Sequence, residues 1–237
     1  MKRTALCYGA QMSCSRYFLL LSLLLSLLIS DLSQAKTIVS SVTKSQMLLL
    51  RQVDQKYQKQ HGIHIEFKKS ILLGILGTKK SSEGELWLSD GQMRLDIKKP
   101  ESSRVVAGLE FLWIESPVLD GERPQVLKTT LNSKKAQSQA LIQLLTRGGV
   151  FKHFRVTGVK IDGKRLNYFL QPDQSSVEFK RAQIQVDPQS RELLTLKYWD
   201  QMDNETTYTF IKTEFDQKLD KKIFAYKPPE NAELVVF

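Results

Sequence analysis

The sequence predicts an α+β protein whose main body is a curled antiparallel sheet. Short strand-like segments follow one another in two runs, and turn signals separate them at Asp162–Gly163, Asp187–Pro188 and "MDNE" at 202–205. Helical segments are few and lie apart from the strands, which is typical of the α+β class. Strands of this length with frequent turns predict an antiparallel meander, curled into a barrel or half barrel.

The first 35 residues have the features of a secretory signal peptide. Lys2, Arg3 and Arg16 precede the apolar run "YFLLLSLLLSLLIS", and Ser33 and Ala35 have the spacing that signal peptidase reads. We expect cleavage after Ala35 and export of a single domain, residues 36–237. An uncleaved membrane anchor is the alternative, although the apolar run is shorter than the roughly 20 residues of a spanning helix. Both cysteines, Cys7 and Cys14, lie in the leader, so the exported domain has no disulfide.

The exported domain begins with an amphipathic helix that ends near Gly62. Val42, Leu49, Val53 and Tyr57 recur at helical spacing, and no proline interrupts them. The first strand run follows as "IHIEFKKSILLGILG", "EGELWLS", "MRLDIKK" and "SRVVAGLEFLWIESP". The second comprises "FRVTGVKI", "RLNYFLQ", "SVEFKRAQIQV", "ELLTLKYW" and "TTYTFIKTEF".

The first strand run contains a hairpin with a wholly aliphatic face. Asp90–Gly91 predicts a two-residue turn, which places Leu88 opposite Met93, Trp87 opposite Arg94 and Leu86 opposite Leu95. Because side chains alternate along a strand, one face is aliphatic and the other carries Trp87, Arg94 and charged residues. The aliphatic residues are Leu86, Leu88, Met93, Leu95 and Ile97.

A helix is expected between the two strand runs, at 136–146. Ala140, Leu141, Leu144 and Leu145 fall on one helical face, and Gly148–Gly149 is the stop signal.

The charge of the chain is +10, with 35 basic and 25 acidic residues. The basic residues are scattered as pairs rather than gathered into a cluster of the kind that nucleic acid requires, so no nucleic-acid partner is expected. Solvated strand edges are one interpretation of these pairs, and attraction to anionic membrane surfaces or an acidic partner is the other. The pairs are Lys68–Lys69, Lys79–Lys80, Lys98–Lys99, Lys134–Lys135, Lys164–Arg165 and Lys221–Lys222.

No catalytic or metal-binding constellation is present in the sequence. His61 and His64 in "HGIH" have no third ligand nearby, and His153 stands alone. Glu83, Glu85 and Asp96 alternate regularly, as on the solvated side of a sheet, rather than forming a glycosidase pair. We therefore expect no enzymatic activity, no metal and no cofactor.

Several segments together resemble the periplasmic lipoprotein carriers of the LolA family. "MRLDIKKP" is similar to their apolar–Arg–x–acidic segment ending in Pro, and "GELWL" to their Gly-x-Leu strand. "FLWIESP" resembles their Leu-Trp strand, and "LDKKIFAYKPPENAELV" their closing segment. The elements also occur in the family's order, so the chain is identified as a divergent member.

The resemblance implies an incomplete, strongly curved antiparallel barrel, with helices as a lid over an apolar cavity. It implies that the cavity receives lipoprotein acyl chains, taken from an inner-membrane releasing transporter and handed to an outer-membrane acceptor. In the family, an Arg of an Arg–Pro turn helps to hold the lid shut. Asp90 and Gly91 stand at that turn here, and Arg94 matches the family's second Arg, so Trp87 and Arg94 are the candidates for a cross-strand or latch pairing.

We therefore predict a monomeric carrier with an apolar hollow that its own side chains do not fill. The residues predicted to line this hollow are Leu86, Leu88, Met93, Leu95, Ile97, Val106, Leu112 and Ile114. Leu141, Leu144 and Leu145 are predicted to face it from the lid. Ordinary core packing is the alternative at each position. The alternative function is an envelope sensor or assembly factor of the same fold that binds lipid or protein without shuttling it.

Overall fold

The computed structural model describes residues 40–117, 123–133, 145, 149–173 and 179–237. By its internal contacts the chain divides into two compact units, residues 1–38 and 39–237, and every described residue belongs to the second. The predicted signal peptide with its predicted cleavage site, and the predicted lid residues Leu141 and Leu144, lie outside the described residues. Within the described residues, no helix has both the length and the apolar character needed to cross a bilayer.

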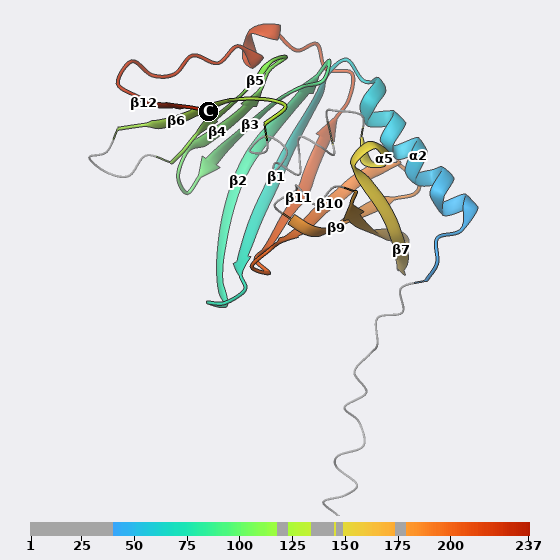
Figure 1. Cartoon of the computed structure of the whole chain (residues 1–237). Helices are drawn as coiled ribbons and strands as arrows, with labels where there is room; N and C mark the ends of the chain where they lie inside the picture. Colours follow the sequence, from blue (N-terminus) through green and yellow to red (C-terminus); the bar gives the residue numbers. More distant parts are fainter. Residues whose placement is uncertain (1–39, 118–122, 134–144, 146–148, 174–178) are drawn as a thin grey trace, which may run out of the picture. The chain divides into compact units, whose positions relative to one another are not determined.

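The second unit is dominated by one large, curved sheet of twelve strands that does not close into a barrel (Figure 1). Its strand order is β12-β6-β5-β4-β3-β2-β1-β11-β10-β9-β8-β7, so β12 and β7 form the two edges. Two meanders, β1 to β6 and β7 to β11, join where β1 pairs with β11. This confirms the predicted α+β half barrel.

The strands of the first meander are β1 (Ile63–Leu73), β2 (Thr78–Ser89), β3 (Gln92–Lys99), β4 (Ser103–Ala107), β5 (Phe111–Glu115) and β6 (Gln125–Thr130). Those of the second are β7 (Phe154–Asp162), β8 (Arg165–Pro172), β9 (Phe179–Asp187), β10 (Glu192–Asp200) and β11 (Glu205–Glu214). The chain ends with the short helix η1 (Lys221–Phe224) and β12 (Glu233–Val236).

Strands β6 and β12 were not predicted, and they make the sheet mixed. All other neighbouring strands are antiparallel, whereas β12 pairs with β6 in parallel. Both strands are short, and all four residues of β12 are exposed, so neither has the alternating pattern that marks a strand in a sequence.

The predicted first helix is α2 (Lys44–Lys59), which begins at a capping box. The Thr43 side chain accepts a hydrogen bond from the Gln46 backbone N–H, and the Gln46 side chain accepts one from the Thr43 N–H. Leu50, Val53 and Tyr57 are the buried residues of this helix, and they join the cluster of buried side chains on the sheet.

Two tyrosines tie α2 to the second meander. The Tyr168 hydroxyl donates to the Gln46 carbonyl over 2.8 Å, and the Leu193 backbone N–H donates to the Tyr57 hydroxyl over 3.1 Å. The first bond joins α2 to β8 and the second joins α2 to β10, so together they fix the position of α2 over these two strands.

Candidate functional site

The β2–β3 hairpin has the register that the sequence predicts. Leu86 pairs with Leu95, Trp87 with Arg94 and Leu88 with Met93, around a turn at Asp90–Gly91. Asp90 and Gly91 both have positive φ angles, as a tight hairpin turn of this kind requires. We call the side of the sheet that carries Leu86 and Leu95 the core face, and the opposite side of β2 to β5 the polar face.

The core face continues across β4 and β5, with one correction to the predicted lining residues. Leu95 pairs with Val105 and Val105 with Ile114, so these side chains share the core face; Leu112, opposite Ala107, also lies there. Val106 pairs with Arg94 and with Trp113, which places it on the polar face. Val106 was predicted wrongly because Val105 and Val106 are adjacent, and the sequence does not show which of two valines faces inward.

Ile97 lies at the margin of the core face, where β2 and β3 come close together. Its partner is Gly84, and a Cβ at Gly84 would lie 2.2 Å from the Asp96 carbonyl oxygen and 2.8 Å from the Phe67 ring. Only a residue without a side chain allows this approach. The Gly of the "GELWL" segment therefore has a packing role that the sequence alone did not show.

The predicted lining residues are close-packed rather than arranged around an open hollow. Leu86, Leu88, Met93, Leu95 and Leu112 are at most 5% exposed and belong to one cluster with α2, while Ile97 and Ile114 are partly buried against it. One hollow that described residues line includes Leu88, a predicted lining residue, and has a volume of about 140 Å³. Most of its lining is polar, and includes Gln58, Lys59 and Gln60. The expectation of an open hollow is thus not met by the described residues.

That small hollow brings a predicted cavity residue and a predicted lid residue together. Leu88 and Leu145 both line it, beside Tyr57 of α2 and the Asp90–Gly91 turn. Leu145 is 5% exposed and belongs to the buried cluster. It is the lid residue that the structure describes.

Leu145 and the short helix α5 (Val150–His153) are each attached to α2 by a polar contact. The Asp54 carboxylate accepts a 2.9 Å hydrogen bond from the Val150 N–H, and the Gln58 side chain donates to the Leu145 carbonyl over 3.5 Å. Burial raises the pKa of Asp54, against the lowering effect of the Val150 N–H and of Arg51. Sequence reasoning missed Asp54.

Gly149 makes the contact between α5 and α2 possible. Its φ is 73° and its ψ is −166°, a combination that is essentially restricted to glycine. A Cβ at this position would lie 2.0 Å from an Asp54 carboxylate oxygen. Gly149, the second glycine of the predicted helix stop, is thus also the point where α5 approaches α2.

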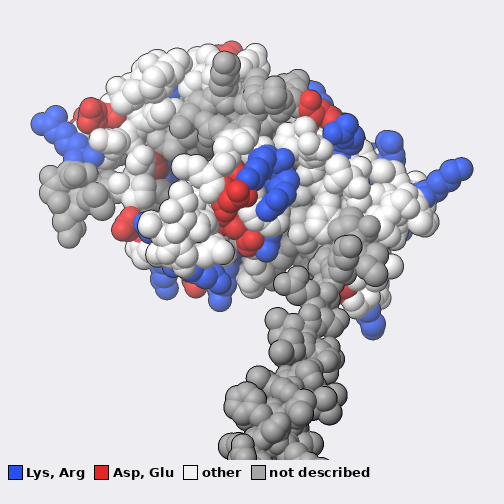
Figure 2. All heavy atoms as spheres, turned by 60° about the horizontal axis from the view of Figure 1, so that its bottom comes forward, with Lys and Arg blue, Asp and Glu red and all other residues white. Residues whose placement is uncertain are grey.

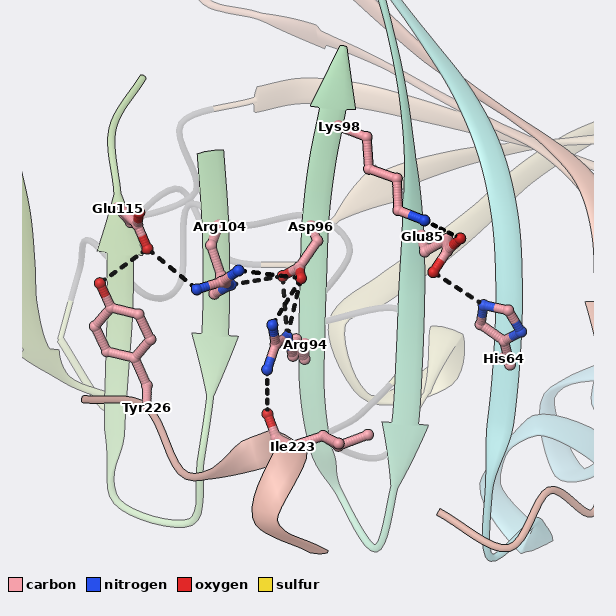
Figure 3. A network of polar contacts seen from close by, with 9 residues as sticks. All are labelled: His64, Glu85, Arg94, Asp96, Lys98, Arg104, Glu115, Ile223 and Tyr226. Atoms are coloured by element: carbon pink, nitrogen blue, oxygen red, sulfur yellow. Dashed lines mark hydrogen bonds and ion pairs between the residues drawn. The ribbon is translucent and has the colours of Figure 1, made fainter. Parts of the chain in front are cut away.

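The polar face of β3 to β5 carries a network of charged side chains (Figure 3). Asp96 lies between two guanidinium groups, with Arg94 Nη2 at 2.8 Å and Arg104 Nε at 2.9 Å from its oxygens. Burial raises the pKa of Asp96, but the hydrogen bonds from both arginines outweigh it, and the pKa lies below its usual value. Arg104 also approaches Glu115, over 3.4 Å.

This network ties down the C-terminal segment, not a lid on the core face. Arg94 Nη1 donates to the Ile223 carbonyl over 3.0 Å, and the Tyr226 hydroxyl donates to Glu115 over 3.0 Å. The Tyr226 ring contacts Trp113 at a centroid distance of 5.4 Å. Val106, in the row between Arg94 and Trp113, is 1% exposed.

Trp87 and Arg94 form the predicted cross-strand pair, since the Arg94 guanidinium lies 5.8 Å from the centre of the Trp87 ring. On the neighbouring strand β1, His64 lies opposite Trp87, and the two rings stack at a centroid distance of 5.3 Å. His64 lies between Glu214, at 3.2 Å, and Glu85, at 3.5 Å.

Two acidic residues of this face, Glu85 and Asp96, are engaged with basic partners. Glu85 pairs with Asp96 across the strands, but Lys98 contacts Glu85 and two arginines contact Asp96. The described residues contain no group of three or more histidine, cysteine or carboxylate side chains that could hold a metal ion. The arrangement thus consists of structural ion pairs over an apolar layer.

Residues 58–227 match the protein family described as "Outer membrane lipoprotein carrier protein LolA". No curated protein matches the chain in sequence. Solved structures with a similar fold include a LolA superfamily protein of Nitrosomonas europaea, which is 10% identical. That likeness covers 75% of this chain and 96% of the other, with a TM-score of 0.43.

Two further structures are similar at the same low level. An uncharacterized conserved protein of Thermus thermophilus is 10% identical over 81% of this chain and 99% of its own, with a TM-score of 0.47. The complex of MucA and MucB of Pseudomonas aeruginosa contains a chain 12% identical, over 79% of this chain and 62% of its own, with a TM-score of 0.40. Likeness at this level says nothing about function.

Proposed function

Because this chain belongs to the LolA family of outer membrane lipoprotein carriers, we propose that it is a periplasmic carrier that shields the acyl chains of lipoproteins, or of related lipids, on the core face of its sheet. The coarser part of this statement, a binding or carrier type of function in the periplasm, comes with the family. The cargo and the core face as its binding surface are our proposal.

The apolar core face of β2 to β5 carries the proposal. Leu86, Leu88, Met93, Leu95 and Leu112 form an aliphatic surface without a charged side chain among them, on a sheet that does not close. An acyl chain leaving a bilayer loses about 0.8 kcal/mol of burial for each CH2 group unless a protein covers it. A soluble carrier therefore needs a broad apolar surface, and flexible side chains such as Met93 and the leucines suit an imprecise ligand.

The close packing of this surface implies that loading requires an opening. The small hollow at Leu88 and Leu145, about 140 Å³ in volume and lined largely by polar residues, does not have room for the several acyl chains of a lipoprotein. We propose that the segment at Leu145 and α5 moves away from α2, which breaks the Asp54–Val150 bond and exposes the core face. Cargo would replace the packing that the covering segment provides when the site is empty.

As a carrier, the protein would collect cargo from an inner-membrane lipoprotein-releasing transporter and hand it to an outer-membrane acceptor. Export through a signal peptide cleaved after Ala35, action as a monomer and the absence of catalysis remain predictions within this proposal.

The proposal is tested first by native mass spectrometry of the protein purified from periplasmic extracts. We expect bound lipid or lipoprotein. The core face is then tested with Val105→Thr and its matched control Val106→Thr, which place the same hydroxyl on adjacent residues of opposite faces. A hydroxyl in contact with an acyl chain is expected to weaken cargo binding about tenfold for Val105→Thr only.

Two results would contradict the proposal. One is a protein that carries no lipid and takes up none from lipoprotein-loaded membranes. The other is an equal effect of the two valine substitutions on cargo binding, because the core face would then not be the binding surface.

A further inference from the structure

The hairpin that connects β1 and β2 ends in an exposed apolar tip. Ile75 is 84% exposed and Leu76 is 72% exposed, and Leu72, near the end of β1, is 40% exposed. β3 pairs with β2 only from Glu83 onward, so the distal half of the hairpin extends past β3 (Figure 1). Large aliphatic side chains gathered at a projecting tip indicate a contact with something outside the chain.

A neighbouring turn enlarges this apolar tip. The Gly74 N–H donates to the Asn204 side chain over 3.0 Å, which holds the β10–β11 turn against the β1–β2 turn. Met202 of that turn is 65% exposed. The tip thus carries apolar side chains from two adjacent hairpins, which is more than one solvent-exposed residue at a loop end would explain.

Lysines surround the hollow behind this tip. Where β2 and β3 diverge there is a hollow of about 770 Å³, lined by Lys68, Lys69, Lys79 and Lys99 with Ser81 and Glu83 among others. Lys80 follows on the same exposed stretch of β2. Figure 2, which turns the lower end of Figure 1 toward the viewer, shows a largely uncharged surface with basic side chains at several points and acidic side chains beside some of them.

These lysines differ from other basic residues of the sheet in forming no close ion pair among the described residues, although Glu83 is the cross-strand neighbour of Lys68 and of Lys99. Lys98, Lys197 and Lys212 are each paired with a glutamate. In contrast, Lys68, Lys79, Lys80 and Lys99 form no ion pair with a carboxylate within the part of the chain that the structure describes.

The acidic groups of the neighbouring turn contact that turn itself or Lys180, rather than the lysines of the hollow. Asp203 lies 2.5 Å from Lys180, and Asp200 accepts hydrogen bonds from the Met202 and Asn204 N–H groups. The end of the hairpin therefore presents an apolar tip with a net positive charge behind it, because Glu83 is one carboxylate among Lys68, Lys69, Lys79 and Lys99 in the lining of the hollow.

We propose that the β1–β2 hairpin docks the protein on an anionic membrane surface, with its tip inserted into the interface and its lysines at the lipid headgroups. Strand geometry fits this arrangement, because Lys79 is three residues from Leu76, or roughly 10 Å along a strand. Apolar faces of interfacial elements enter a bilayer by about 5–10 Å, which would bring Lys79 and Lys80 to headgroup level. The more distant lysines would act within about one Debye length of the surface.

Charged edge strands that prevent aggregation are a simpler reason for Lys79 and Lys80, since β2 has a free edge here. That reason does not explain Ile75 and Leu76, because an exposed aliphatic tip promotes association instead of preventing it. An anionic lipid surface accounts for both features at once. This inference is independent of whether the core face carries cargo.

The test is co-sedimentation of the protein with vesicles of phosphatidylcholine, with or without phosphatidylglycerol as the anionic lipid. We expect binding to the anionic vesicles at low salt, weaker binding at physiological salt and little binding to neutral vesicles. Ile75→Gln/Leu76→Gln is expected to reduce the partition coefficient by about tenfold. Lys79→Gln/Lys80→Gln is expected to reduce it by about fivefold for each lysine.

Matched controls change the same residue types elsewhere. Leu48 is 57% exposed on α2, and Lys221 and Lys222 are exposed on η1, so Leu48→Gln and Lys221→Gln/Lys222→Gln should leave vesicle binding close to that of the wild type. Native mass spectrometry of the tip variant should show unchanged cargo, which separates this inference from the proposed carrier function. Wild-type protein that does not prefer anionic vesicles at low salt, or a tip variant that binds them equally well, would overturn it and leave a protein partner for the tip.

Discussion

Replacing Gly149 by alanine is the sharpest test of how the covering segment is held on α2. The added Cβ would lie 2.0 Å from an Asp54 carboxylate oxygen, so that carboxylate has to move away from the Val150 N–H. Alanine would also have to adopt a backbone conformation, φ 73° and ψ −166°, that belongs to glycine. The substitution therefore acts on one contact through two independent effects.

The magnitude follows from these two effects. A non-glycine residue in this region of backbone conformation costs about 1–3 kcal/mol. A lost hydrogen bond to a charged acceptor costs about 1.5–3 kcal/mol. Together they amount to about 3–5 kcal/mol, and the change is expected first as local opening of the segment at Leu145 and α5.

Amide hydrogen exchange at Val150 measures this opening directly, because its N–H donates to Asp54. Exchange of that amide should be at least about 100-fold faster in Gly149→Ala, since about 1.4 kcal/mol corresponds to a factor of ten. Gly163→Ala is the control: its φ is also positive, at 59°, but no atom lies within 4 Å of the added Cβ. It should leave Val150 exchange unchanged and cost about 1–2 kcal/mol in its own turn.

The reasoning fails if Val150 exchanges at the same rate in Gly149→Ala as in the wild type. It also fails if Gly163→Ala accelerates that exchange equally. If the carrier proposal is right as well, Gly149→Ala should take up lipid faster than the wild type, because the contact that must break for loading is already weakened.

Three further predictions concern charge and packing. Asp54→Asn keeps an acceptor for the Val150 N–H and removes a carboxylate whose pKa is raised by burial. Because that carboxylate lowers the stability of the wild type as pH rises through its folded-state pKa, the variant should be at least as stable as the wild type in urea denaturation at pH 7. The difference in stability should close toward about pH 4. Asp96→Asn should do the opposite, because the pKa of Asp96 is lowered in the folded state. The stability that this carboxylate contributes is present above the unfolded-state pKa of about 4 and is lost as pH falls through the folded-state pKa. The variant should therefore be less stable than the wild type at pH 7, and denaturation at acid pH should show a smaller difference. Gly84→Ala should lower the free energy of unfolding by about 1–3 kcal/mol or more, measured by denaturant titration, because its Cβ would overlap the Asp96 carbonyl and the Phe67 ring; a loss below about 0.5 kcal/mol, typical of a surface change, would contradict the observed strand approach.

Local rules in the sequence were sufficient for the β2–β3 hairpin. A two-residue turn at Asp90–Gly91 fixes the register, and the two-residue period of a strand then assigns Leu86, Leu88, Met93 and Leu95 to one face. The first helix and most strands followed from periodicity and turn residues in the same way. Each of these decisions depends on residues that are near neighbours in the chain.

The tertiary structure decided what lies opposite those faces. Val105 and Val106 are equivalent in sequence, and only their pairing with β3 and β5 shows that Val106 faces Arg94 and the C-terminal segment. The parallel pairing of β12 with β6, the contact of Asp54 with Val150 and the close packing of the predicted hollow all join parts of the chain that are far apart in sequence. The periodicity of apolar residues along a strand or helix predicts which face is buried. It does not predict which distant segment of the chain covers that face, because that depends on tertiary packing.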